Sequence, residues 1–225
     1  MRCDSGLRKG LIAPVLLALG VIMAGCGGAG GSGSGHQRAA GLGGRLLKDK
    51  ADILRLKDQI IQTNAALNDI ITDPQRDLKP QFKAFSSAVK KLDSMVKKAR
   101  ERTVAIQASL DKYIDTWRDD VVGIQDPTLR EQAISRVTQA KESFQRLYAE
   151  LTGTKEVLTP YVGSLKDIQR YLDTDLTPAG LKTIKPLADK AMGSQNQVLQ
   201  RLDALAAELE RVAAELAAGQ RKAGS

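Results

Sequence analysis

Apolar residues recur at alternating steps of three and four along three long stretches of the chain. In the first stretch the repeat continues for five heptads without a slip, and Thr103 is its one polar member. Such a repeat places apolar side chains on one face of a helix that packs against other helices. Its members are Phe82, Phe85, Val89, Leu92, Val96, Ala99, Thr103, Ile106, Leu110, Tyr113 and Trp117. The spacing predicts a helix over about residues 80–122.

The second stretch keeps the same spacing and has a clear start. Asp126 and Pro127 predict an N-cap and a first helical residue. Pro160 lies inside the stretch and removes one backbone donor, so we expect a kink over residues 155–158. The core positions are Ala133, Val137, Ala140, Phe144, Leu147, Leu151, Thr154, Leu158, Tyr161, Leu165, Ile168 and Leu172.

The third stretch follows Thr177 and Pro178, which predict the start of another helix. We expect Pro186 to break or bend its first turns. The core positions are Leu181, Ile184, Ala188, Ala191, Gln195, Val198, Leu202, Leu205, Leu209, Val212 and Leu216.

A shorter helix is predicted before these three, over about residues 45–71. The connections between the four helices are only a few residues long, so neighbouring helices are expected to run antiparallel. The pattern thus predicts an all-α fold, an elongated antiparallel bundle or coiled coil over residues 45–219, with a disordered end at 220–225. Whether the first helix packs along the others or projects toward a partner stays open. Its apolar residues recur at intervals of seven, as Leu46, Ile53, Ile60 and Leu67 with Leu47, Leu54 and Ile61 beside them.

Residues 1–25 have the profile of a signal peptide. Basic residues precede thirteen apolar or small residues, a run shorter than the roughly 20 that span a membrane. The run ends in Met23-Ala24-Gly25-Cys26, which resembles the lipobox of bacterial lipoproteins, although that pattern prefers Leu where Met23 stands. We expect cleavage before Cys26 and a covalent lipid such as palmitate on it. The alternative is an ordinary secretory signal with Cys26 incidental.

The residues after Cys26 predict a tether and a compartment. Residues 26–44 are rich in Gly and Ser and are expected to form a flexible link between lipid and bundle. The residue after Cys26 is Gly27, and not the aspartate that would resemble an inner-membrane retention signal. We therefore expect the cell envelope, at the periplasmic face of the outer membrane if the organism has two membranes.

Composition offers few groups for catalysis or metal binding. Aromatic residues make up 4% of the chain, and the formal net charge of +8 falls to +6 without residues 1–25. With Cys3 in the signal peptide and Cys26 lipidated, the folded part has no thiol for a disulfide, a nucleophile or a zinc site. The single histidine, His36, has no second ligand nearby in sequence. We expect no enzymatic activity, no metal and no cofactor other than the lipid.

Basic side chains gather on the outward face of the first long helix. Only Asp93 and Glu101 interrupt this basic stripe, which consists of Lys83, Lys90, Lys91, Lys97, Lys98, Arg100 and Arg102. The favoured interpretation is a solvated face, or one that pairs with the acidic last helix. The alternative is a contact with anionic lipid head groups or cell-wall polymer. Nucleic acid is not expected as a partner.

Three segments resemble a family of bacterial coiled-coil lipoproteins that is catalogued as a domain of unknown function. They are Phe82-Lys83-Ala84-Phe85, Ile114-Asp115-Thr116-Trp117, and residues 172–187 with the turn Leu176-Thr177-Pro178-Ala179. The resemblance implies a lipobox, a short first helix and coiled-coil helices over the whole mature domain. It implies no activity.

The function predicted from the sequence is that of a membrane-anchored envelope lipoprotein. Its helical bundle is expected to be a non-catalytic structural or interaction module that binds a partner protein. The alternatives are a membrane-active protein that remodels bilayers, a cell-wall binder and a periplasmic chaperone. No segment after residue 25 approaches eighteen consecutive apolar residues, which disfavours bilayer insertion.

Overall fold

The computed structural model describes residues 34–221, and all four elements of this part are α-helices. They are α1 (Gly35–Thr72), α2 (Lys79–Val122), α3 (Pro127–Thr174) and α4 (Pro178–Arg221). The all-α prediction is confirmed, and α1 is the shortest helix, with 38 residues against 44, 48 and 44. The predicted signal peptide, the lipobox and Cys26 lie outside the described residues.

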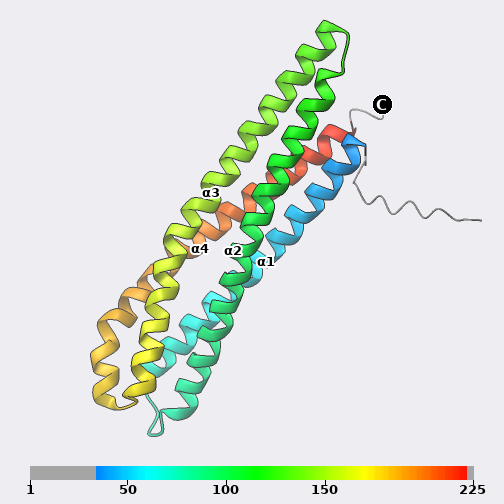
Figure 1. Cartoon of the computed structure of the whole chain (residues 1–225). Helices are drawn as coiled ribbons and strands as arrows, with labels where there is room; N and C mark the ends of the chain where they lie inside the picture. The colour runs from blue at the N-terminus through cyan, green and yellow to red at the C-terminus, as the bar shows by residue number, and fades with distance from the viewer. Residues whose placement is uncertain (1–33, 222–225) are drawn as a thin grey trace, which may run out of the picture. The chain divides into compact units, whose positions relative to one another are not determined.

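The helices form a four-membered bundle in which each helix contacts two others. Helix α1 packs against α2 and α4, and α3 packs against the same two helices (Figure 1). Short loops join consecutive helices, so neighbours along the chain run antiparallel, as predicted. Residues 34–221 all belong to one compact unit. The first helix is therefore part of the bundle and does not project from it.

Local capping residues explain where α3 and α4 begin. The Asp126 carboxylate accepts a hydrogen bond from the Leu129 backbone N–H at 2.8 Å, and Pro127 is the first helical residue. Thr177 Oγ1 accepts from the Gly180 N–H at 3.1 Å in the same way. These side chains satisfy N–H groups that have no partner in the first helical turn. The starts predicted from the sequence are confirmed.

The two internal prolines do not end their helices. Helix α3 continues through Pro160, and α4 continues through Pro186. Both prolines are exposed, so water can reach the carbonyl oxygen that each leaves without a donor. The prediction that Pro186 breaks the first turns of α4 is wrong, whereas a bend at Pro186 and a kink over residues 155–158 of α3 stay predictions.

The start of α1 differs from the prediction. The helix begins at Gly35, ten residues before Arg45, so residues 35–44 of the predicted tether 26–44 are helical. Ala39 and Leu42 are buried in a core cluster that also holds Ala213 and Leu216 of α4. This burial outweighs the low helix propensity of the glycines in the segment. The last helix also extends to Arg221, into the predicted disordered end.

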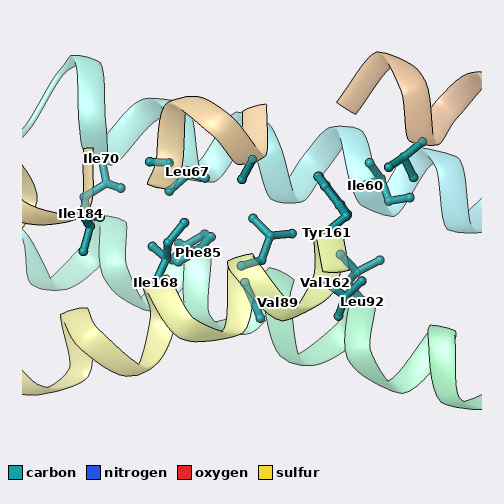
Figure 2. Close-up of a cluster of buried hydrophobic side chains, with 14 of the residues drawn as sticks. Ile60, Leu67, Ile70, Phe85, Val89, Leu92, Tyr161, Val162, Ile168 and Ile184 are labelled. Carbon is teal, nitrogen blue, oxygen red and sulfur yellow. The ribbon is translucent and has the colours of Figure 1, made fainter. Parts of the chain in front are cut away.

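Two clusters of buried side chains form the hydrophobic core. The first surrounds Phe85, where side chains of all four helices point toward one another, among them Leu67, Ile168 and Ile184 (Figure 2). The second surrounds Leu110 and Phe144. Every core position predicted for the three long helices is buried or half-buried. The heptad pattern therefore predicted the register of these helices correctly.

Candidate binding surfaces

The basic stripe lies on the exposed face of α2. All seven of its side chains are exposed. Helix α2 packs against α1 and α3 and not against α4, so the predicted pairing of the stripe with the acidic last helix is wrong. Two acidic residues of α4 pair with α1 instead: Glu210 with Lys50 at 2.8 Å, and Asp203 with Lys57.

The C-terminal part of the stripe joins α2 to its neighbours. The Arg102 guanidinium pairs with Asp52 of α1 and lies 3.9 Å from Asp49. Arg100 donates to Thr159 Oγ1 of α3 at 3.0 Å. These two cations of the stripe therefore have a structural role.

Asp93 interrupts the stripe and links two helices. It accepts hydrogen bonds from Lys97 of its own helix at 2.9 Å and from Lys166 of α3 at 3.1 Å. These two lysines hold the pKa of the Asp93 carboxyl below its usual range, because both stabilise the carboxylate. Lys97, like Arg100 and Arg102, is thus engaged within the bundle.

Four lysines of the stripe are available to an external partner. Lys83, Lys90, Lys91 and Lys98 form no ion pair or side-chain hydrogen bond within residues 34–221. They are exposed along one helix, over four to five turns, and Lys98 also borders a pocket of the bundle. An uncompensated positive face of this kind attracts anions at low ionic strength.

A row of large apolar side chains is exposed on α1. Leu47, Leu54 and Ile61 are 50%, 43% and 46% exposed and recur at intervals of seven. They share one face of the helix, because seven residues are close to two helical turns. We call them the α1 apolar row. The ion pairs of Lys50 and Lys57 with α4 border this row on one side.

A pocket of about 280 Å³ lies in the middle of the bundle, between the two core clusters. All four helices contribute to its lining. Ala99 and Thr103 of α2 and Thr154 of α3 occupy core positions at this level, where most other heptads carry Leu, Ile, Val or Phe. These side chains are too small to fill the space between the helices. The small residues at core positions were visible in the sequence, but the pocket itself was not predicted.

Acidic residues stand on the α1 side of the pocket. Asp49 and Asp52 both line it and both face Arg102. Burial raises the pKa of the Asp49 carboxyl, and the nearby Arg102 charge partly counteracts that rise. Arg55 of α1 also lines the pocket and pairs with Asp52, so two carboxylates and two guanidinium groups balance on this side.

The described residues contain neither a metal cluster nor a spanning helix. Within 34–221, no three His, Cys, Asp or Glu side chains come together as metal ligands. His36 lies in the exposed first turn of α1, 2.8 Å from Ser34 Oγ, and not in a tether as expected. Over the same residues, no helix is long and apolar enough to cross a bilayer.

Comparison with protein-family models gives one match, over residues 51–216. The family is described as "Protein of unknown function (DUF2959)". The matched region begins within α1 and ends within α4, so it includes the first core cluster, the second cluster except Ala39, Leu42 and Leu46, and the pocket except Asp49. No curated protein and no solved structure matches the chain.

Proposed function

Because the chain belongs to the family described as Protein of unknown function (DUF2959), whose description assigns no activity, we propose a function from its own residues. The protein is a lipid-anchored component of the bacterial cell envelope, and its bundle binds another protein without catalysis. The sequence Met23-Ala24-Gly25-Cys26 supports the anchor. In an organism with two membranes, the proposed location is the periplasmic face of the outer membrane.

The early start of α1 sharpens this proposal. Only eight Cα-to-Cα steps separate Cys26 from Ser34, the residue before α1. A chain of this length extends at most about 29 Å. The first turns of α1 would therefore stay close to the membrane surface, together with Asp120 of α2, which pairs with Arg38.

The α1 apolar row is the main observation in support of protein binding. Three large apolar side chains at heptad spacing form the same pattern that buries α2, α3 and α4, yet here no helix of the bundle covers it. Covering three half-exposed Leu and Ile side chains would contribute about 3 kcal/mol. Arg45 and Lys48 are exposed on the same helix and form no ion pair within the described chain. The partner that fits is an amphipathic helix with acidic flanks.

Site-specific photo-crosslinking in living cells tests this surface. A photoreactive residue at position 54 should give a discrete adduct, whereas one at Val104 of α2, which is 67% exposed, should not. Leu47→Glu with Ile61→Glu should abolish the adduct at position 54, because a charge on the row opposes burial. Equal adducts at both positions, or an adduct that survives the glutamates, would contradict the proposal.

A second candidate function is binding to an anionic surface. It is favoured by the four lysines of the stripe that have no partner within residues 34–221. The protein should then bind anionic vesicles more tightly than neutral ones, and moderate salt should weaken that binding. Lys90→Glu with Lys91→Glu should remove the preference. Equal binding to both kinds of vesicle ends this candidate.

A further inference from the structure

The wall of the central pocket offers aliphatic contacts. Leu158, Leu202 and Leu205 belong to its lining and to the two core clusters. The three threonine hydroxyls of the lining are already used. Thr103 donates to the Ala99 carbonyl at 3.0 Å, Thr154 donates to the Arg201 carbonyl at 3.4 Å, and Thr159 accepts from Arg100 at 3.0 Å. Water in this space finds few partners, so an aliphatic chain gains free energy by displacing it.

The rim of the pocket carries an excess of positive charge on its α2–α3 side. Lys98 and Arg100 of α2 and Lys155 of α3 line the pocket and are exposed. None of the three forms an ion pair with another described residue, and Arg100 has only the Thr159 hydroxyl as partner. On the α1 side, in contrast, the carboxylates of Asp49 and Asp52 balance the guanidinium groups of Arg55 and Arg102. An anionic head group would form ion pairs with the cations on the α2–α3 side.

We infer that the central pocket binds a single-chain anionic amphiphile. The alkyl chain lies between the two core clusters, and the carboxylate or phosphate group lies near Lys98, Arg100 and Lys155. The pocket volume of 280 Å³ is about twice that of the ~150 Å³ cavity that accommodates benzene, which suits one alkyl chain. This ligand chemistry is common to free fatty acids and lysophospholipids. The site depends neither on the lipid anchor nor on the α1 apolar row.

Calorimetric titration with single-chain probes tests the inference. The protein is the unlipidated mature chain, residues 26–225 with Cys26→Ser, which includes the whole compact unit. Decanoate, below its micelle concentration, should bind saturably and about tenfold more tightly than decyltrimethylammonium, which has the same chain and the opposite charge. Tighter binding of decanoyl lysophosphatidylglycerol would identify a lipid as the source, and tighter binding of decanoate a fatty acid. No saturable anion binding, or equal binding of the cation, overturns the inference.

Two variants separate the roles of the cavity and the rim. Ala99→Leu with Thr103→Leu fills the pocket, so decanoate binding should weaken more than about tenfold while the melting temperature rises. Lys98→Glu with Arg100→Glu preserves the cavity and should abolish the preference for the anion. Lys90→Glu with Lys91→Glu makes the same charge change on α2 away from the pocket and should leave binding unchanged. Undiminished binding by the filled variant, or equal effects of the two charge changes, also overturns the inference.

Discussion

Asp93 provides the clearest pH-dependent contact among the single side chains. Its carboxylate accepts from Lys97 and Lys166, so its pKa in the folded protein lies below the ordinary value. A carboxyl whose pKa is lower in the folded state than in the unfolded state stabilises the fold at pH values above its unfolded-state pKa. That contribution is lost as the pH falls through the folded-state pKa. The link between α2 and α3 should therefore weaken in acid.

Removing this carboxylate tests the link. Asp93→Asn should lower the free energy of unfolding of the unlipidated mature chain by about 0.5–1 kcal/mol at neutral pH. The difference should shrink as the pH falls below the ordinary carboxyl range, because the wild-type carboxyl then also takes up a proton. Urea denaturation at neutral and at acidic pH measures it. Asp167→Asn is the control, because the exposed Asp167 pairs only within α3 and should matter little at either pH. A difference that is as large in acid as at neutral pH would refute this role.

Three polar side chains form a hydrogen-bonded layer inside the bundle, and only one of them stood out in the sequence. Tyr161 of α3 donates to Asn64 of α1 at 2.9 Å, and Asn64 donates to Gln195 of α4 at 2.5 Å. Gln195 was visible as the polar member of its heptad repeat. Asn64 was not, because it lies outside the repeat of Leu46, Ile53, Ile60 and Leu67, and only the packed bundle shows its partners. Such a layer favours one register among helices of similar pattern.

At the scale of helices, the features that depend on local sequence were predictable. The starts of α3 and α4 follow from side chains within a few residues, and the heptad repeats determine the buried face. The first ten residues of α1 depend instead on Ala213 and Leu216, at the other end of the chain. Gly43 lies close to α4, where an added Cβ would be 3.4 Å from the Ala213 carbonyl oxygen. The segment also has a local start signal, a capping box in which the Ser34 backbone N–H donates to the Gln37 side-chain oxygen at 3.1 Å.

Glycine substitutions test the early start of α1. At Gly41 and Gly44 an added Cβ would meet no atom within 4 Å. Gly41→Ala with Gly44→Ala should therefore raise the free energy of unfolding by about 1–2 kcal/mol, because alanine favours a helix. Gly180→Ala should destabilise the protein, since the new Cβ would lie 2.2 Å from the Asp175 carbonyl oxygen. If the Gly41 and Gly44 substitutions leave stability unchanged, residues 35–44 are not helical in solution.

At the scale of the compact unit, the bundle combines a divided core with two surfaces that its own helices do not cover. The all-α class and the antiparallel order were predictable, because short connections and long repeats leave few alternatives. The central pocket was not, since its volume depends on how four helices meet around Ala99, Thr103 and Thr154. The sequence pattern likewise could not show that Leu47, Leu54 and Ile61 face outward, because their spacing equals that of a core row.

For the whole molecule, we propose that the bundle works at a membrane and is held there through Cys26. Labelling growing cells with radioactive palmitate and isolating the protein tests it most directly. We expect label in the wild-type protein and in Cys3→Ser, and none in Cys26→Ser, because Cys3 would be removed with the proposed signal peptide, residues 1–25. Label that persists in Cys26→Ser, or a wild-type protein without label, would contradict the account.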